Sequence, residues 1–213
     1  LKFPPSPLSV SYPVIAQELS KYYGDHLVFK EAGFTIQREE KVAFVGRNGE
    51  GKSTLVKCIM GEITDYTGKL TLGHNVQIGY FAQNQASLLD EELTVFQTVD
   101  DVTTPELKSN TKNLLGAFMF SGDDIDKKVK VLSGGERTRL AMIKLLLQPV
   151  NLLILDEPTN HLELQTKDIL KNALIDFDGT LIVVSHARDL LNGLAQKVYE
   201  IERGKVTQHV ADN

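Results

Sequence analysis

One short stretch, FVGRNGEGKSTL at residues 44–55, restricts the fold of this chain more than any other. It contains the spacing G-x-x-x-x-G-K-S, with Gly46, Gly51, Lys52 and Ser53 at the fixed positions. The apolar run KVAFV precedes the glycines and STLVKCIMG follows them, so the stretch predicts a turn between a buried strand and a helix. A strand, a glycine-rich turn and a helix in this order indicate an α/β fold.

The residue types in this turn are those of a phosphate-binding loop. In such a loop the backbone N–H groups point at phosphate oxygens, the lysine reaches the β- and γ-phosphates, and the serine hydroxyl ligates Mg²⁺. The dipole of the following helix attracts the same anion. A glycine-rich loop that matches by chance is the alternative. The strand before the loop, and the helix after it that is expected to end at Gly61, favour the phosphate site.

The composition is that of an ordinary globular chain, with 213 residues, 42% of them hydrophobic and 24% charged. The formal net charge of −5 argues against a broad surface for nucleic acid, although a local basic patch stays open. Cys58 is the single cysteine, which fits a reducing cytoplasm, and we expect its thiol to be a small core group. No apolar run approaches the roughly 20 residues that cross a membrane, and no signal peptide is visible.

The pattern along the chain predicts a linker, a sheet region and an insert. Residues 1–13 are rich in proline and serine and are expected to be the end of an extended linker, and the first residue, Leu1, points to a longer protein. Short strand-like runs from Val14 to the phosphate loop predict an antiparallel layer, and residues 68–83 predict two more strands around the turn GHN. Residues 84–132, roughly, lose this strand character and are predicted to form a small helical insert.

Helical spacing within the insert predicts a helix that begins near Glu106 and includes Leu107, Leu114, Leu115, Phe118 and Met119. The run DDIDKK that follows is either a ligand site or a solvated helix end, and the second interpretation is favoured. After the insert, ERTRLAMIKLLL predicts a helix that stops before Pro149. NLLILDEP and GTLIVVSH are continuous apolar runs, typical of parallel strands covered on both faces, with the amphipathic helix TKDILKNALIDF between them.

Polar side chains end the two apolar runs. Asp156 and Glu157 follow the first, where Asp156 would hold Mg²⁺ directly or through water and Glu157 would act as general base on an attacking water. The alternative, that both carboxylates only cap the next helix, is weakened by the phosphate loop in the same chain. His186 follows the second run and can bond a γ-phosphate, although a lone histidine is more often structural. Gln83 closes the strand before the insert and can contact Mg²⁺ or the water.

The stretch LSGGE, residues 132–136, predicts a second anion-binding feature. Ser133 stands at the N-cap of a helix, and the two glycines after it leave N–H groups free beside a hydroxyl and a helix dipole. The chain thus has one nucleotide-binding loop but two features that attract an anion. The simplest interpretation is that the second feature serves a nucleotide held by another domain.

Together these motifs resemble those of an ATP-binding-cassette (ABC) nucleotide-binding domain, in that family's order and over nearly the whole chain. GRNGEGKST resembles the Walker A loop, LSGGE the signature, LLILDEP Walker B and TNHLE the D-loop, with Gln83 as Q-loop and His186 as switch histidine. The resemblance implies an α/β P-loop fold over residues 14–213, with a mixed central sheet, an antiparallel β layer and a small helical subdomain. It also implies ATP and Mg²⁺ as cofactors, with Tyr23, or its neighbour Tyr22, stacked on adenine.

The resemblance assigns roles position by position. It implies catalytic roles for Glu157, His186 and Gln83, and Mg²⁺ ligands at Ser53, Gln83 and Asp156. The loop residues expected to bind ATP are Gly46, Asn48, Gly49, Gly51, Lys52, Ser53 and Thr54. The signature residues expected to contact the ATP of a partner cassette are Ser133, Gly134, Gly135 and Glu136. An isolated cassette, which lacks that partner, is expected to hydrolyse ATP poorly.

LDEPTNHLE and LSGGERTRLAMIKLLL are similar to the ABC-F group, which implies a cytoplasmic protein of two cassettes without a membrane domain. Known members act on the ribosome, as translation factors or as antibiotic-resistance proteins, through a helical linker that enters the tRNA exit region. LKFPPSP resembles the end of that linker, so this chain would be the second, C-terminal cassette, with the first cassette and the ribosome, including its rRNA and tRNA region, as partners.

Two positions depart from the family pattern. Glu163 stands at the end of the D-loop where aspartate is usual, and Ala187 follows the switch histidine where aspartate is usual. Neither change removes the catalytic carboxylate, but Ala187 can weaken the positioning of the loop around His186. Two other functions stay open, namely the ATPase subunit of a membrane transporter and a cassette that binds ATP without hydrolysis. TNHLE argues against the first, and the intact Asp156, Glu157 and His186 argue against the second.

Overall fold

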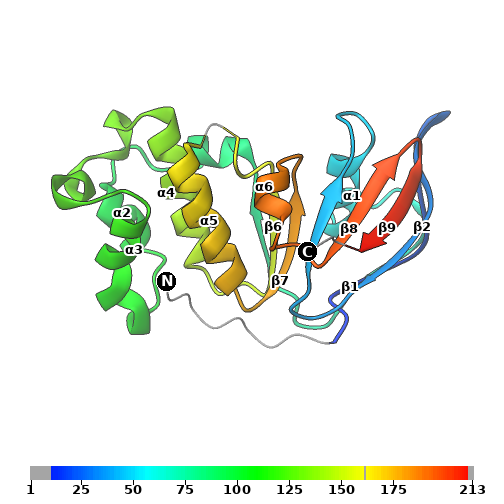
Figure 1. Ribbon diagram of the computed structural model, residues 1–213, viewed down its shortest axis with the longest axis horizontal. Coiled ribbons are helices and arrows are strands. Elements are labelled where there is room, and N and C mark those ends of the chain that lie inside the picture. The colour runs from blue at the N-terminus through cyan, green and yellow to red at the C-terminus, as the bar shows by residue number, and fades with distance from the viewer. Residues whose placement is uncertain (1–10, 161, 211–213) are drawn as a thin grey trace.

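The computed structural model describes residues 11–160 and 162–210 and divides them into two sheets and a group of helices. Figure 1 shows the antiparallel sheet at one end of the long axis and the helices α2 and α3 at the other, with the central sheet and α4 and α5 between them. Most of the predicted linker, residues 1–10, lies outside the described residues. Across the part that the structure describes, no helix has the length and apolar character needed to cross a membrane.

The smaller sheet has the strand order β2-β1-β4 and is antiparallel, as predicted for the layer before the loop. Its strands are β1 (Val14–Tyr23), β2 (His26–Ile36) and β4 (Thr67–Leu72). A tight turn at Gly24, whose φ is +58°, joins β1 to β2 and places Tyr23 opposite His26. The sheet therefore ends in a hairpin that carries two aromatic side chains.

The central sheet has the strand order β5-β6-β7-β3-β8-β9, in which β9 alone is antiparallel to its neighbour. The bounds of its strands are β3 (Lys41–Val45), β5 (Ile78–Phe81), β6 (Leu152–Asp156), β7 (Thr180–Val184), β8 (Lys197–Glu202) and β9 (Lys205–Val210). This arrangement confirms the prediction of a mixed central sheet. The two strands predicted around the GHN turn both form, but β4 pairs in the small sheet and β5 in the central one.

Two hydrophobic cores hold the layers together. The first lies between the two sheets, where the rings of Phe34, Phe44 and Tyr199 meet with centroids 5.2–6.1 Å apart, and it includes the buried Cys58 of α1 (Lys52–Ile59). The second lies between the central sheet, the insert and the helices α4 (Gly134–Leu146) and α5 (Leu164–Asp176). Continuous apolar runs in β6 and β7 suit strands that are covered on both faces by these cores.

Short helices occupy the stretch for which a helical insert is predicted. They are η1 (Gln83–Leu88), α2 (Val95–Asp100), η2 (Pro105–Asn110), α3 (Thr111–Ala117), η3 (Gly122–Asp126) and η4 (Val129–Val131). The single helix predicted from Glu106 to Met119 is wrong. Pro105 begins a 3-10 turn, α3 then runs only to Ala117, and Met119 has a left-handed φ of +71° that a helix does not allow.

Candidate functional site

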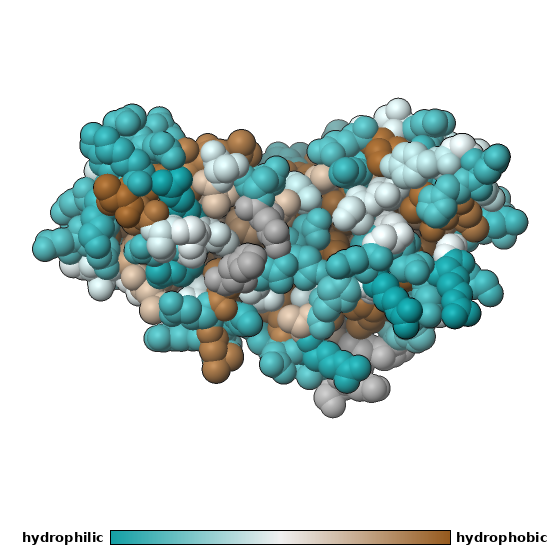
Figure 2. Space-filling view, turned by 90° about the horizontal axis from the view of Figure 1, so that it is seen from above, coloured by the Kyte–Doolittle hydropathy of each residue, from teal (hydrophilic) through white to brown (hydrophobic). Residues whose placement is uncertain are grey.

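Three strands that are neighbours in the central sheet end at the same edge. The order β6-β7-β3 places the carboxylates after β6 beside His186 after β7, and His186 beside the glycine loop after β3. Because the three strands are parallel, their carboxyl ends point the same way, which is upward in Figure 1. Figure 2 views the molecule from that side, where the surface is largely hydrophilic and interrupted by separate hydrophobic patches. Ligands of open α/β sheets collect at such an edge.

The glycines of the loop are required by close approach of the backbone. A Cβ atom on Gly46, whose φ is +150°, would lie 2.4 Å from the carbonyl oxygen of Ile201. A Cβ atom on Gly51, whose φ is +105°, would lie 2.6 Å from a methyl carbon of Val28. Helix α1 starts directly after Gly51 without a side-chain cap, so the N–H groups of its first turn have no intrahelical acceptor. The loop thus presents unpaired donors, the condition for binding a phosphate.

Lys52 lies inside this loop, with only 6% of its surface exposed. Its ammonium donates to the carbonyl oxygen of Gly46 at 2.5 Å and to Nε2 of His186 at 2.7 Å. Burial lowers the pKa of Lys52, and the nearby carboxylates of Glu157 and Asp156 partly offset that effect. The ammonium is therefore held between the loop and the ends of the next two strands.

His186 and Glu157 also meet, with Nε2 of the histidine 3.4 Å from Oε1 of the glutamate. Nε2 cannot accept a hydrogen bond from Lys52 and donate one to Glu157 at the same time. Nε2 of His186 thus lies between the ammonium of Lys52 and the carboxylate of Glu157, and the contact with Lys52 is the shorter of the two. Glu157 adopts a left-handed φ of +49°, while its N–H donates to the carbonyl oxygen of Val184. Such strain in a non-glycine residue costs about 1–3 kcal/mol and collects at functional sites.

The Asp156 carboxylate is half-buried at the end of β6. Burial raises its pKa, and the hydrogen bond from Tyr80 and the charges of Lys52 and Lys57 partly offset that increase. The Tyr80 hydroxyl donates to Oδ2 of Asp156 at 3.4 Å, and burial together with the charge of Asp156 raises the pKa of Tyr80 to about 12. Tyr80 lies in none of the sequence motifs that predict the site. Its place on β5, next to β6 in the sheet, is the feature that brings it to the site.

The residues of this site line two separate cavities. The first, the loop cavity, has a volume of about 390 Å³ and is lined by Tyr23, His26, Val28, Asn48, Gly49, Gly51, Lys52, Ser53 and Thr54. The second, the carboxylate cavity, has a volume of about 590 Å³ and is lined by Lys57, Glu62, Tyr80, Ala82, Asn84, Gln85, Asp156 and Glu157. Tyr23 lines the loop cavity and Tyr22 does not, as expected because consecutive strand residues point to opposite faces.

The chemistry of the oxygen donors near Lys52 fits Mg²⁺. This ion takes oxygen ligands, keeps several waters and is usually held by one or two protein groups together with phosphates. The exposed Ser53 is the second residue of α1, and the half-buried Asp156 ends β6. Within residues 11–160 and 162–210, no cluster of three or more histidine, cysteine, aspartate or glutamate side chains could hold an ion on its own. Gln83 begins η1, but its side chain lies outside the described part of the structure.

The signature residues lie at a third place, the N-terminus of α4. Ser133 is the N-cap; its Oγ accepts from the Glu136 N–H at 3.2 Å, and Oε1 of Glu136 accepts from the Ser133 N–H at 3.0 Å. This bond to Ser133 lowers the pKa of Glu136. Ser133, Gly135 and Glu136 line a cavity of about 290 Å³ that shares no residue with the loop or carboxylate cavity. The hydroxyl hydrogen of Ser133 stays available, since its oxygen is the acceptor in the capping box.

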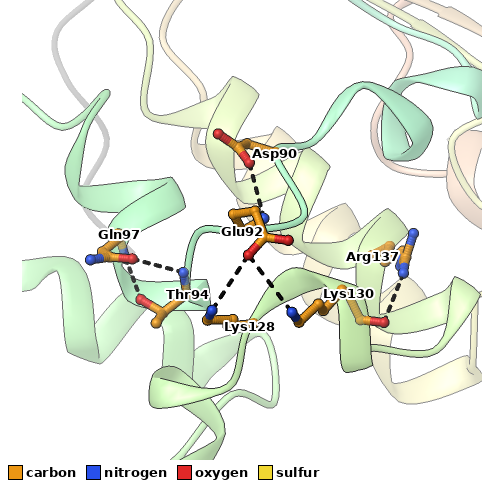
Figure 3. A network of polar contacts seen from close by, with 7 residues as sticks. All are labelled: Asp90, Glu92, Thr94, Gln97, Lys128, Lys130 and Arg137. Carbon is orange, nitrogen blue, oxygen red and sulfur yellow. Dashed lines mark hydrogen bonds and ion pairs between the residues drawn. The ribbon is translucent and has the colours of Figure 1, made fainter.

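A polar network fixes the segment that leads into the signature. Glu92 pairs with the ammonium groups of Lys128 and Lys130 at 3.4 and 3.7 Å, as Figure 3 shows. Arg137 on α4 donates to three acceptors, namely the carbonyl oxygens of Lys130 and Leu132 and the Oε1 atom of Glu91. The insert and the signature helix are therefore joined through one guanidinium group.

The two positions that depart from the family pattern both stand at helix N-caps. Glu163 is the N-cap of α5, and its side chain makes no capping hydrogen bond. Ala187 is the N-cap of α6 (Arg188–Leu191) and has no side chain that can cap, although its N–H donates to Oγ of Ser185 at 3.0 Å. His161 of the D-loop lies outside the described residues. Both changes thus remove the shorter capping carboxylate that aspartate would supply.

Comparison with known proteins gives consistent results. A family model described as ABC transporter matches residues 29–160. The chain is 41% identical over its whole length to ABC transporter F family member 5 of Arabidopsis thaliana, of which it covers 31%. It is 45% identical over 183 residues to the putative ATP-binding protein YdiF of Bacillus subtilis, covering 85% of this chain and 28% of that protein. The chain therefore spans less than a third of the length of these curated relatives.

A solved structure supports the fold alone. A bacterial Atm1-family ABC exporter, solved with ATP bound, matches 97% of this chain and 40% of its own chain with a TM-score of 0.79. The two sequences are 16% identical, so the likeness concerns the arrangement of strands and helices.

Proposed function

We propose a function for this chain on the premise that it belongs to the ABC family and, within it, to the F group. A domain of this family binds and hydrolyses ATP. We infer that this cassette does so with Mg²⁺, and that ATP-driven closure against a second cassette is coupled to action on the ribosome. The observation that carries the catalytic part is the contact of Lys52 with His186 and of His186 with Glu157 at three adjacent strand ends.

In this proposal the nucleotide extends along the loop cavity. Adenine stacks on Tyr23, and the phosphates lie over the loop from Gly46 to Gly51 and the first turn of α1. Ser53 and Asp156 hold Mg²⁺, with Gln83 as a further ligand. The ion, when bound, neutralises charge on the phosphates. The lining of the loop cavity supports this placement, since it includes Tyr23, residues of the glycine loop and the first three residues of α1.

In the hydrolytic step, Lys52, Glu157 and His186 each have a separate role. Phosphate oxygens replace Gly46 and His186 as acceptors for the Lys52 ammonium, which already lies inside the loop. Glu157 takes a proton from the attacking water, since its carboxylate lines the carboxylate cavity. His186, released by Lys52, turns a ring N–H toward the γ-phosphate and so responds to the presence of that group. The oxygen of this water attacks the γ-phosphorus, and the bond between the γ-phosphorus and the bridging oxygen of the β-phosphate breaks.

A second cassette completes the site. Ser133, Gly134, Gly135 and Glu136 line or adjoin a cavity separate from the loop cavity, which supports their use on a nucleotide bound elsewhere. In the longer protein that partner is the other cassette of the same chain, and this one is the second, C-terminal cassette. The isolated chain then hydrolyses ATP weakly, because its own signature does not reach its own γ-phosphate.

The ribosomal part of the proposal rests on the motifs LDEPTNHLE and LSGGERTRLAMIKLLL, together with the relatives of the F family. It makes the longer protein a cytoplasmic translation factor or an antibiotic-resistance protein that contacts rRNA and the tRNA region. Membrane transport is the competing function. The ribosomal function predicts that the protein is retained on ribosomes, whereas the transport function predicts that it is retained on membranes.

Glu157→Gln, made in the longer protein, separates the two functions. Glutamine keeps the shape but does not accept the proton, so hydrolysis should fall by about 10²–10⁴-fold while ATP binding survives. The closed variant should then sediment with ribosomes through sucrose in the presence of ATP and leave them without it. Glu157→Gln combined with Lys52→Ala, which also loses the phosphate contact, is the matched control. A variant that traps ATP but stays out of the ribosomal pellet would contradict the ribosomal function and leave the ATPase standing.

A further inference from the structure

One buried cation has no part in the site described so far. Lys21 on β1 is only 4% exposed. Its ammonium donates to the carbonyl oxygen of Asp65 at 2.6 Å, lies 3.7 Å from Oδ2 of the same residue and stands 4.7 Å from the centroid of the Tyr23 ring. The register of β1 shifts between Lys21 and Tyr22, and the ammonium of Lys21 lies over the ring of Tyr23 across this irregularity.

The surroundings of Lys21 give the Tyr23 ring a role in holding that charge. A buried ammonium is unfavourable unless its donors meet acceptors. The Asp65 carboxylate is fully exposed, so its attraction is weakened by water. The carbonyl oxygen of Asp65 accepts a hydrogen bond from the ammonium, and the face of the Tyr23 ring attracts the cation through its quadrupole. The side chains of Lys21 and Tyr23 therefore position each other.

The same ring borders the loop cavity. Tyr23 is 52% exposed and lines that cavity with His26 and Val28, while the ammonium of Lys21 covers one face of its ring. A ring in this arrangement is fixed from behind and offers its other face to a ligand. A cation on the rear face also withdraws electron density, which favours stacking of an electron-rich purine on the front face.

We propose that Lys21 is a positioning residue for the nucleobase: it fixes and polarises the Tyr23 ring on which the base stacks. This inference rests on the base site proposed above and adds a residue that never touches the nucleotide. It assigns to Lys21 an effect on ligands that carry a base and none on ligands that consist of phosphate alone.

The test compares two ligands on matched variants. ATP and inorganic tripolyphosphate, each with Mg²⁺, are titrated calorimetrically into the wild type and into Lys21→Gln. Glutamine keeps a donor for the Asp65 carbonyl oxygen and removes the cation. We expect the affinity for ATP to fall by about 3- to 30-fold and the affinity for tripolyphosphate to stay within a factor of about 2. Lys69→Gln, an exposed position on β4 of the same sheet, makes the same charge change and should alter neither.

Coupling to the ring gives a readout that a purely structural role would not produce. In a Tyr23→Leu background, Lys21→Gln should have no further effect on ATP, because the element through which it acts is gone. Lys21→Met provides a second neutral variant, and retained binding of tripolyphosphate shows that either variant has kept the loop folded.

The outcomes separate this inference from the proposed function. If the wild type binds ATP no better than tripolyphosphate, the base site at Tyr23 is wrong. If ATP is preferred but Lys21→Gln leaves that preference unchanged, or weakens both ligands equally, the role of Lys21 is wrong and the base site stands.

Discussion

The ammonium of Lys52 is hydrogen-bonded to Nε2 of His186 at 2.7 Å, which joins the glycine loop after β3 to the end of β7. Because the same Nε2 lies 3.4 Å from Glu157, the histidine stands between the cation and the carboxylate. A ligand that draws Lys52 toward itself therefore also releases His186. In the proposed function, this arrangement couples the binding of phosphate at Lys52 to the side chain that detects the γ-phosphate.

Lys52→Ala should weaken the binding of ATP and Mg²⁺ by about 2–5 kcal/mol, because the phosphates lose a charge-assisted partner. Calorimetric titration of the isolated chain measures this loss. Lys69→Ala removes the same charge at an exposed position and should bind as the wild type does. Unchanged affinity in Lys52→Ala would remove the phosphate-loop assignment.

The free energy of unfolding should depend on pH through the carboxyl group of Asp156. Burial raises the pKa of this carboxyl, so its ionised form is less favourable in the folded state than in the unfolded state. The protonated carboxyl therefore stabilises the folded state relative to the carboxylate. This stabilisation is fully present below the unfolded pKa, near 3.8, and is lost as the pH rises through the higher pKa of the folded state.

Asp156→Asn should therefore unfold at a higher urea concentration than the wild type at pH 7, and this advantage should shrink as the pH falls toward 4. Asparagine keeps an oxygen that can accept from Tyr80. Urea midpoints of both proteins across that range give the comparison. An advantage that grows as the pH falls would show that the pKa is lowered in the folded state.

Arg137→Lys should loosen the segment before the signature. Lysine keeps the charge but does not span the three acceptors that the guanidinium reaches, so we expect a loss of about 1–2 kcal/mol. Hydrogen exchange of the amides at 130–133, together with urea unfolding, measures the effect. Lys130→Ala breaks only an exposed pair with Glu92 and should cost less than about 1 kcal/mol. Equal effects of the two changes would argue against the role given to Arg137.

Local chemistry explains which features the sequence predicted well. Glycine spacing identified the loop, and apolar runs that end in Asp156 and in His186 identified two strands whose polar ends meet in the parallel sheet. These features need only residues close in the chain. The separation of β4 from β5 into different sheets depends on pairing with β1 and β6, which are distant in sequence, so the GHN turn did not reveal it.

Two further features depend on tertiary structure. Tyr80 reaches Asp156 because β5 lies beside β6, although 76 positions separate the two residues. The helix predicted through Met119 ends at Ala117, because the backbone adopts a left-handed φ at Met119. The apolar spacing of the sequence continues to Met119, so it predicted a longer helix. The spacing of residues in the sequence predicts neither the contact of Lys21 with the Tyr23 ring nor the three hydrogen bonds of Arg137.

The composite site is tested most directly by mixing two variants of the isolated chain. Lys52→Ala removes the phosphate contact and Ser133→Arg obstructs the signature, so each variant alone should be nearly inactive at every concentration. An equal mixture should recover up to about a quarter of the wild-type rate, since half of random pairs are mixed and each mixed pair has one intact site. The wild-type rate per chain should rise with protein concentration. A constant wild-type rate per chain, with Ser133→Arg as active as the wild type, would contradict a site completed by a second cassette.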